Sequence, residues 1–404
     1  MKTVAIVGTF DTKGNEFLYV KNVLEELGLK TLTINTGVFD PVFEADVSNV
    51  EVAAAAGYDI KEIVARKDRA MATEALSKGT EAIVPKLFAE GKFDGIMSCG
   101  GSGGTSLATP AMRALPIGVP KLMVSTLASG NVAQYVGTSD IIMMPSIVDV
   151  AGLNKISKTI FRNAALAMAG MVGMKASLKP EAEDPKPLVA ATMFGVTTPC
   201  VDRAKAYLEE KGYEVLVFHA TGTGGKTMES LINAGFFKGV LDLTTTEWCD
   251  QVCGGVLSAG PNRCAAAINT KVPQVCSVGA LDMCNFGPME TVPEQYKDRN
   301  LYKHNPTVTL MRTNVEECKE IGKNLCEKWS AAQVPMTILL PMKGVSMIDA
   351  EGQPFYGPEE DAVLYAEIKK INNPNVEIIE MDNNINDPEF AVAAAAKLVE
   401  LMNA

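Results

Sequence analysis

The sequence predicts an α/β protein built from two Rossmann-like, doubly wound domains with mainly parallel sheets. Short β-rich runs alternate with runs whose apolar residues recur at helical spacing, as in parallel strands joined by crossover helices. Several expected strands are apolar on both faces, as strands are when helices cover both sides of a sheet. The alternation stops once, at a proline-rich stretch, and then restarts. These three observations predict the fold class.

The first half begins with a strand that ends in a glycine-containing loop. Lys2–Phe10 is β-rich, and Asn15–Leu27 has apolar residues at helical spacing until Gly28 ends the helix. The same order then repeats. We expect strands at Thr31–Val38, Phe93–Cys99, Lys121–Ser125 and Ile141–Met144, and helices at about Arg69–Glu90, Leu107–Leu115 and Ile156–Met174.

A linker is expected at Ser177–Pro187, where three prolines and several charges separate apolar segments. The domains are therefore expected at residues 1–178 and 188–404. The second domain is expected to serve small-molecule binding or dimerisation. Its expected strands are Leu188–Phe194, Glu214–His219, Gly239–Thr244, Gln274–Val278, Thr307–Met311, Met336–Leu340 and Val376–Glu380; its helices are Val201–Glu210, Thr227–Ala234, Val315–Trp329, Glu359–Ile371 and Glu389–Met402.

The acidic composition restricts the classes of partner. The formal net charge is −11 and the isoelectric point is near 5.0, so general DNA or RNA binding is not expected. No apolar stretch is long enough to span a bilayer, so a membrane partner is not expected either. Nine cysteines and no recognisable signal peptide suit a reduced cytoplasm. We therefore expect a cytoplasmic protein.

The loop after the first strand is a candidate ligand loop. It offers hydroxyls, a carboxylate and an ammonium group directly after a strand, where ligands gather in open α/β sheets. A polar turn in which Asp11 or Thr12 caps the next helix is an equally good interpretation. The candidate binding residues are Gly8, Thr9, Asp11, Thr12 and Lys13.

A second loop carries four glycines between a strand and a helix. Glycine lets the backbone approach a ligand closely, and the amides at the following helix start can hold an anion. The spacing fits neither the dinucleotide fingerprint nor a P-loop. A tightly packed turn is the alternative, but phosphate binding is favoured. The candidate residues are Gly100, Gly101, Ser102, Gly103, Gly104 and Thr105.

Two further loops extend this site. Thr126, Ser129 and Gly130 follow the next strand and suit a second phosphate or a ribose. Thr138 stands in the fourth loop, and Asp140 and Asp149 are expected to hold the Mg²⁺ that accompanies a nucleotide. Capping roles in solvated loops explain these acids equally well.

The second half offers weaker candidates. Ala220–Thr227 fits a relaxed P-loop pattern, but no partner Asp lies at a suitable distance, so another kind of glycine-rich anion loop is favoured. Asp282, His304 and Arg312 could form a catalytic group, with His304 as a general base, although a lone histidine is more often a structural residue. Arg263 and Arg312 would suit a carboxylate or phosphate ligand.

Many separated motifs resemble the ATP-binding family related to the tomato mosaic virus resistance protein. They include VGTFDTKG, SCGGSGGTSLAT, VSTLASGN, VGTSDI, SIVDVAGLN, FHATGTGGKTME, GGVLSAGPNR and LYKHNPTVTLMRT. The resemblance covers nearly the whole chain. It implies a Rossmann-like domain that binds ATP with Mg²⁺, a second α/β domain and a homodimer. One departure is Asn384, which stands where the family is expected to have His.

Together these features predict a nucleotide-binding protein of small-molecule metabolism. ATP and Mg²⁺ would occupy the first-half loops, and an anionic small molecule would be the second ligand. Phosphoryl transfer or ATP-dependent ligation is the expected reaction class, with Lys13 stabilising phosphate charge. The alternatives are a non-catalytic ATP-binding regulator of a protein partner, and a lyase or hydrolase that works through Asp282, His304 and Arg312.

Overall fold

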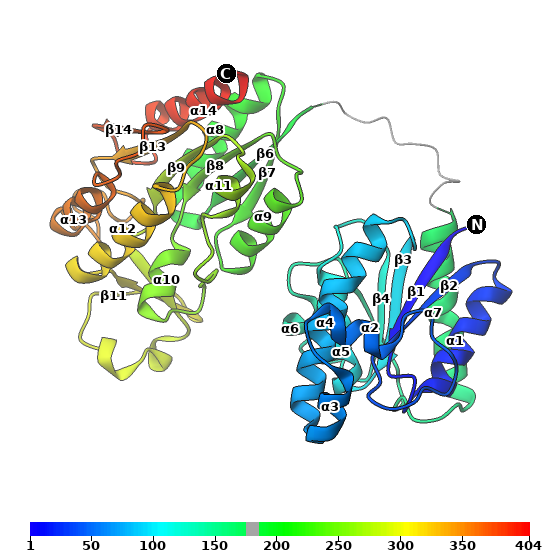
Figure 1. Ribbon diagram of the computed structural model, residues 1–404. Helices are drawn as coiled ribbons and strands as arrows, with labels where there is room; N and C mark the ends of the chain where they lie inside the picture. Colours follow the sequence, from blue (N-terminus) through cyan, green and yellow to red (C-terminus); the bar gives the residue numbers. More distant parts are fainter. Residues whose placement is uncertain (175–185) are drawn as a thin grey trace. The chain divides into compact units, whose positions relative to one another are not determined.

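The computed structural model describes residues 1–174 and 186–404 (Figure 1). The chain divides into two compact units, Met1–Glu183 (unit 1) and Asp184–Ala404 (unit 2). The linker expected at Ser177–Pro187 lies almost wholly outside the described residues. Within the described ranges, no helix combines the length and apolarity needed to cross a bilayer.

Unit 1 contains a five-stranded sheet in the order β2-β1-β3-β4-β5. Every neighbouring pair in it is parallel. The strands are β1 (Thr3–Gly8), β2 (Lys30–Asn35), β3 (Gly95–Gly100), β4 (Lys121–Ser125) and β5 (Ile142–Pro145). The helices are α1 (Gly14–Glu26), α2 (Asn49–Ala55), α3 (Ile60–Arg66), α4 (Arg69–Ala89), α5 (Ser102–Arg113), α6 (Ala133–Val136) and α7 (Lys155–Met174).

Successive residues of β1 enter two different cores, which confirms that unit 1 is doubly wound. Val4 and Ile6 pack with residues of α1 and α7 on one face. Ala5 and Val7 pack with residues of α2, α3, α4 and α5 on the other. All four side chains are fully buried. Both faces of β1 are apolar because helices cover both sides of the sheet.

Unit 2 contains a six-stranded parallel sheet in the order β14-β13-β9-β8-β6-β7. Its strands are β6 (Leu188–Met193), β7 (Glu214–His219), β8 (Gly239–Thr244), β9 (Gln274–Gly279), β13 (Met336–Pro341) and β14 (Val376–Met381). Its helices are α8 (Thr198–Glu210), α9 (Thr223–Asn233), α10 (Glu247–Cys253), α11 (Ala266–Thr270), α12 (Val315–Trp329), α13 (Pro358–Ile368) and α14 (Pro388–Asn403).

A small antiparallel sheet in unit 2 departs from the sequence-based expectation. It is formed by β10 (Met283–Phe286), β11 (Leu301–Asn305) and β12 (Val308–Arg312), in the order β10-β12-β11. The expected strand at Thr307–Met311 therefore exists, but it does not join the parallel sheet. The short turn between β11 and β12 leaves no room for a crossover helix, so this pair must be antiparallel.

Both parallel sheets share one topological feature. In unit 1 the first strand, β1, lies between β2 and β3; in unit 2 its counterpart β6 lies between β7 and β8. The chain therefore reverses its direction across the sheet between β1 and β3, and again between β6 and β8. In open α/β sheets the crevice at the carboxyl ends of these two strands is the usual ligand site.

Candidate functional site

A cavity of about 790 Å³ lies at the switch point of unit 1. The loop after β1 lines it with Thr9, Asp11, Thr12 and Lys13, and the loop after β3 lines it with Gly100–Gly104. The structure thus brings together the two loops that the sequence offered as phosphate binders. They meet because β1 and β3 are parallel neighbours whose carboxyl ends lie at the same edge of the sheet.

The start of α5 presents open backbone amides to this cavity. Gly101 is the N-cap residue of α5, and no side chain caps the helix. The first amides of a helix have no acceptor within the helix, so those of Ser102, Gly103 and Gly104 are available. A Cβ on Gly100 would lie only 3.0 Å from Gly104 Cα, which explains why this turn is built from glycine. Such a helix start favours a bound anion.

Three cationic side chains line the same cavity. They are Lys13, Lys67 and Arg69, and none has a carboxylate partner among the described residues. Arg69 reaches over the glycine loop, since a Cβ placed on Gly103 would lie 3.6 Å from Arg69 Nη2. The carboxylates of Asp11, Asp68 and Asp149 line the cavity as well, but Asp11 and Asp68 accept hydrogen bonds from backbone amides. The three cations and the open amides of α5 are therefore the groups that could hold an anion.

Sequence reasoning missed Lys67 and Arg69, which stand at the junction of α3 and α4. Lys67 ends α3 in the left-handed conformation, with φ 52°. Asp68 then caps α4 by accepting hydrogen bonds from the amides of Ala70 and Met71, at 2.9 and 3.1 Å. The run Lys-Asp-Arg matches no anion-binding motif. Its one available signal was a good N-cap residue between two cations.

The other wall of the cavity is apolar. It is formed by side chains of α3, α4, α5 and the loop after β2, namely Ile63, Val64, Leu76, Leu107 and Phe39. The cavity therefore has a polar end at the glycine loop and an apolar end below α3 and α4. This combination suits a ligand that carries both an anionic group and a flat or apolar group.

Asp11 braces the first loop. One carboxylate oxygen accepts hydrogen bonds from the amides of Val38 and Phe39, at 3.0 and 3.1 Å, and the other accepts from Thr12, at 2.7 Å. Asn35 Oδ1 holds the same region by accepting from the amides of Phe10 and Gly37. Asp11 thus lines the cavity but uses its charge to fix the loop.

The third predicted loop is joined to the glycine loop. The amide of Thr126 donates to the carbonyl of Gly100, at 3.2 Å. Thr105 and Ser125 share a hydroxyl hydrogen bond of 2.7 Å. Thr105 is fully buried, so it supports the loop and does not face the cavity. Thr126 and Ser129 line a second, smaller cavity, described below.

Several predicted binding residues lie elsewhere and are corrected. Gly8 is packed against Phe17, whose ring would lie 2.0 Å from a Cβ at Gly8. Thr138 and Asp140 precede β5 and so lie at the amino edge of the sheet, whereas Asp149 follows β5 at the carboxyl edge. Asp140 is paired with Lys121, at 2.5 Å, and accepts from the amide of Gly118. Hydrogen bonding to Lys121 lowers the pKa of Asp140 despite its partial burial.

Gly130 completes the predicted set for unit 1. Its amide donates to the carbonyl of Leu127, at 2.9 Å, which closes a turn after β4. The residue does not line either cavity at the carboxyl edge. No group of three His, Cys, Asp or Glu side chains in the described part of the chain is arranged to hold a metal ion.

The catalytic group expected in unit 2 assembles only in part, because Asp282 and Arg312 lie close together whereas His304 lies apart from them. Asp282 is fully buried, and Arg312 is 6% exposed. Arg312 donates to Asp349 and Asp361, at 3.1 and 2.9 Å, so no ligand is needed to neutralise it. Burial raises the pKa of Asp282 to about 6. His304 is exposed near the turn of the β11–β12 hairpin, several residues from the position that pairs with Arg312.

The amides of the glycine-rich loop in unit 2 are already hydrogen-bonded to a carboxylate side chain of the protein. The carboxylate of Glu247 accepts hydrogen bonds from the amides of Gly222 and Gly225, at 2.8 and 3.1 Å. The other oxygen of Glu247 accepts from Arg263, which is 1% exposed and also bridges to Asp242. The prediction that Arg263 binds a ligand is therefore wrong, because carboxylates of its own unit surround it.

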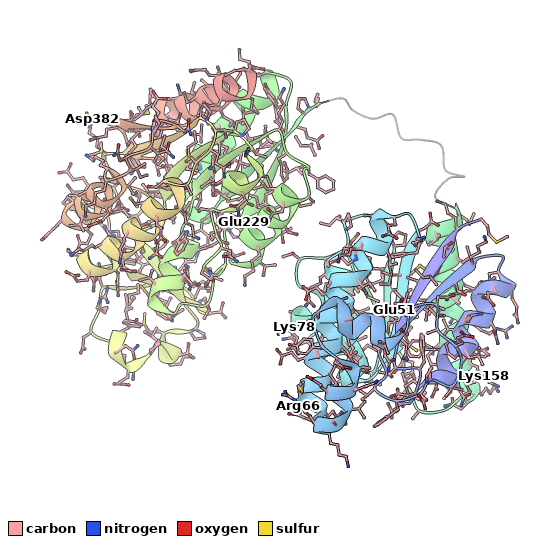
Figure 2. The ribbon with its side chains drawn as sticks, in the orientation of Figure 1. Glu51, Arg66, Lys78, Lys158, Glu229 and Asp382 are labelled. Atoms are coloured by element: carbon pink, nitrogen blue, oxygen red, sulfur yellow. The ribbon has the colours of Figure 1, made fainter. Side chains whose placement is uncertain are left out.

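Glu229 on α9 completes this buried network (Figure 2). It lies 3.3 Å from Arg263 and accepts from the amides of Cys264 and Ala266, at 2.6 and 2.7 Å. Burial is the largest influence on its pKa, which is raised despite the nearby arginine. Asn384, the departure from the expected family pattern, donates to the carbonyls of Lys343 and Ser346 and has a structural role.

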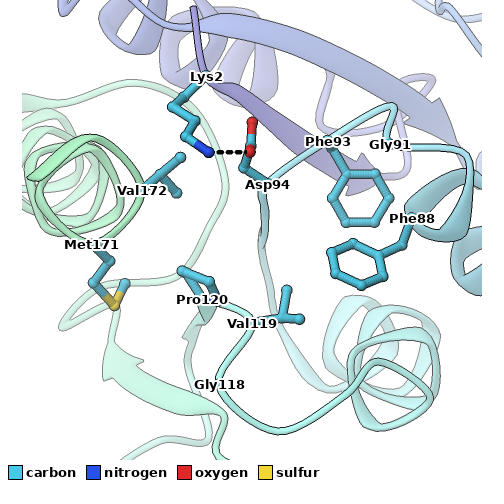
Figure 3. A pocket seen from close by; sticks show the side chains of 10 residues that line it. All are labelled: Lys2, Phe88, Gly91, Phe93, Asp94, Gly118, Val119, Pro120, Met171 and Val172. Carbon is cyan, nitrogen blue, oxygen red and sulfur yellow. Dashed lines mark hydrogen bonds and ion pairs between the residues drawn. The ribbon is translucent and has the colours of Figure 1, made fainter. Parts of the chain in front are cut away.

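A further hollow lies at the opposite edge of unit 1 (Figure 3). It has a volume of about 490 Å³ and is lined mainly by apolar residues, including Phe88, Phe93 and Val172. Lys2 pairs with Asp94 across its rim, at 2.6 Å. This edge carries the amino ends of the strands, and none of the residues that line the hollow begins a helix. The cavity at the carboxyl edge is therefore the stronger candidate site.

Comparisons with known proteins match both units. The model of the uncharacterised protein family UPF0261 N-terminal domain matches residues 2–177, and that of its C-terminal domain matches residues 186–402. A UPF0261 protein of Clostridium tetani is 55% identical, over 99% of each chain. A UPF0261 protein of Rhizobium meliloti is 45% identical over the full length of both.

A plant relative is longer than this chain. The ToMV resistance protein Tm-1(GCR237) of Solanum lycopersicum is 40% identical over 98% of this chain, which spans 55% of that protein. Among solved structures, MurG of Acinetobacter baumannii aligns over 100% of this chain and 92% of its own, with 12% identity and a TM-score of 0.21. A putative UDP-N-acetylglucosamine 2-epimerase of Listeria monocytogenes aligns over 99% and 95%, with 10% identity and a TM-score of 0.25. Scores this low carry no argument about function.

Proposed function

The chain belongs to the UPF0261 family, and since that family name specifies no activity, we propose from the site itself that unit 1 binds ATP with Mg²⁺. The observation that carries the proposal is the set of anion-binding donors in the 790 Å³ cavity. There the open amides of α5 meet Lys13, Lys67 and Arg69, none of which has a carboxylate partner in the described chain.

The shape of the cavity supports a nucleotide in one orientation. The triphosphate would lie on the amides of Ser102, Gly103 and Gly104, with Lys13 and Arg69 at its oxygens. The base would lie against the apolar wall of Ile63 and Leu76. A ligand with phosphate alone would leave this wall exposed to water, so a nucleotide uses the cavity more fully than free phosphate does.

Mg²⁺ would be bound mainly by the phosphate oxygens of the nucleotide. Mg²⁺ is commonly bound by one or two carboxylates together with phosphate oxygens and water. Of the two predicted metal ligands, Asp140 lies at the other edge of the sheet and Asp149 stands at the boundary with the second, smaller cavity, so the phosphate oxygens of the nucleotide and water would hold the ion. The bound ion would neutralise phosphate charge. The proposed reaction class is transfer of the terminal phosphoryl group, for which Lys13 and the α5 amides would stabilise the developing charge.

Calorimetry with ATP, ADP, NAD and inorganic phosphate, with and without Mg²⁺, tests the proposal. We expect ATP to bind most tightly and Gly103→Asp to abolish the binding, because a carboxylate would occupy the anion site. Gly173→Asp is the matched control: Gly173 is an exposed residue of α7 with no atom near its Cβ position. Folded wild-type protein that binds none of these ligands would refute the proposal. Tight ATP binding without any product would point to a regulator.

A further inference from the structure

A second cavity of about 330 Å³ adjoins the proposed nucleotide site. It lies at the carboxyl ends of β4 and β5, and Pro145, Ile147 and Val148 contribute the apolar part of its lining. Its side walls come from Ser125, Thr126, Ser129, Ser146 and Asp149. Its volume is at the lower end of the range of small-molecule sites.

The two cavities meet at a shared side chain. Asp149 lines both of them. The loops behind them also touch, because a Cβ on Gly101 would lie 3.6 Å from Thr126 Oγ1. A phosphate bound on the glycine loop would therefore lie directly beside the second cavity, with the Asp149 carboxylate at the boundary.

The chemistry of the second cavity selects against an anion. No Lys, Arg or His lines it. Several nearby amides already have acceptors, since Leu127 donates to Ser125 Oγ and Ser146 donates to the carbonyl of Ser125. The hydroxyls of Ser125 and Ser146 are also bonded within the protein, to Thr105 and to the carbonyl of Val148. The polar side chains that remain for a ligand are the hydroxyls of Thr126 and Ser129 and the carboxylate of Asp149, which suit an uncharged, hydroxyl-bearing molecule. This differs from the anionic second ligand expected from the sequence.

Backbone strain in the lining is a second, independent observation. Ile147 has φ 67°, in the left-handed region, although its side chain is β-branched. It is 70% exposed, so packing does not compensate for this conformation. Strained residues of this kind concentrate at functional sites, where the loop conformation serves a ligand. The strained turn places Val148 and Asp149 at the boundary of the two cavities.

We propose that this second cavity binds a polyol or sugar-like acceptor and that Asp149 takes the proton from its reacting hydroxyl. The proposal rests on ATP binding in the adjacent cavity. In the reaction the acceptor oxygen bonds to the terminal phosphorus of ATP. The bond from that phosphorus to the bridging oxygen breaks, and its electron pair leaves with ADP. The hydroxyl proton passes to the Asp149 carboxylate and then to water.

The test measures transfer of labelled phosphate from ATP to glycerol, erythritol, ribose and glucose by the full chain. We expect a labelled product with at least one of these probes. Asp149→Asn should lower that transfer by about 100-fold or more, the usual contribution of a general base, while ATP affinity changes by less than about threefold. Asp382→Asn is the matched control, since Asp382 is an exposed residue of unit 2 (Figure 2).

A second variant fills the cavity without touching the nucleotide site. Ser129 is exposed, so Ser129→Trp should fold, keep ATP affinity and lose transfer. If ATP binds but no probe is phosphorylated, or if Asp149→Asn transfers phosphate like the wild type, this inference is wrong while the proposed nucleotide site stands. A large loss of Mg²⁺-dependent ATP affinity in Asp149→Asn would assign the carboxylate to the metal and also overturn it. Absence of ATP binding would refute the proposed function itself.

Discussion

Single residues decide which glycine-rich loop of this chain is open to a ligand. In unit 1 the amides at Ser102–Gly104 face a cavity and have cations beside them. In unit 2 the amides of Gly222 and Gly225 are satisfied by Glu247. In sequence both loops are glycine-rich and stand between a strand and a helix, and the loop of unit 1 was the favoured phosphate binder. The difference arises from one buried carboxylate on another helix, whose position only the fold determines.

Arg69 should contribute strongly to nucleotide affinity. A charge-assisted hydrogen bond contributes about 1.5–3 kcal/mol, so Arg69→Ala should weaken ATP binding by about 10- to 100-fold in calorimetry. Arg66→Ala is the control, because Arg66 is an exposed residue of α3 that does not line the cavity (Figure 2). Equal affinities for both variants would show that Arg69 does not contact the phosphates.

Ile147 should be replaceable by glycine with a gain in stability. A non-glycine residue in the left-handed region costs about 1–2 kcal/mol, and part of this is offset by the greater freedom of glycine in the unfolded chain. Ile147→Gly should therefore raise the free energy of unfolding by about 0.5–1 kcal/mol, measured in urea. The same variant should transfer phosphate more slowly, because the turn before Asp149 becomes less restricted. A loss of stability would contradict the strain argument.

At the scale of the elements, the alternation of strands and helices predicted most of the parallel sheets. The sequence also placed the loops after β1 and β3 at one site, because parallel topology brings carboxyl ends together. The short helices α2 and α3 were not predicted, and α3 with the start of α4 forms the apolar wall of the cavity. Lys67 and Arg69 were missed because the run Lys-Asp-Arg matches no anion-binding motif, although the helix that begins at Arg69 was predicted. The sequence analysis assigned Asp140 and Asp149 to one Mg²⁺ site, but the strand β5 separates them and they lie at opposite edges of the sheet.

The cap of α4 should affect both stability and binding. Asp68→Ala removes two hydrogen bonds to the first amides of α4 and should cost about 1 kcal/mol, since N-cap deletions fall near this value. ATP affinity should also fall severalfold, because Lys67 and Arg69 flank the cap. Ser48→Ala, which removes the capping box that Glu51 completes on α2 (Figure 2), is the control that keeps the affinity. Denaturation and calorimetry distinguish the two effects.

At the scale of the whole molecule, unit 2 should be more stable in mild acid than at neutral pH. Burial raises the pKa of Asp250 to about 7 and that of Asp282 to about 6, from ordinary values near 3.8. The unfolded chain ionises these groups above pH 4, whereas the folded chain keeps them protonated until the raised pKa is reached. The contribution of these two carboxyl groups to the free energy of unfolding is therefore largest below about pH 4. It is lost as the pH rises toward 7.

The measurement is urea denaturation of the full chain between pH 4.5 and 7.5, followed by the fluorescence of Trp248 and Trp329, both buried in unit 2. We expect the free energy of unfolding of this unit to fall with rising pH. Asp250→Asn should reduce the slope, since an amide does not ionise. A slope of the opposite sign, or one that Asp250→Asn leaves unchanged, would contradict the assignment.

The buried contact between Glu247 and its loop also determines how the chain behaves in a phosphate-rich solution. A carboxylate tethered in place acts at a local concentration far above that of any dissolved anion. Millimolar phosphate, sulfate or nucleotide therefore cannot compete for the amides of Gly222 and Gly225. Saturation of the protein with a phosphate-bearing ligand should accordingly follow a single-site isotherm, with a stoichiometry of one per chain.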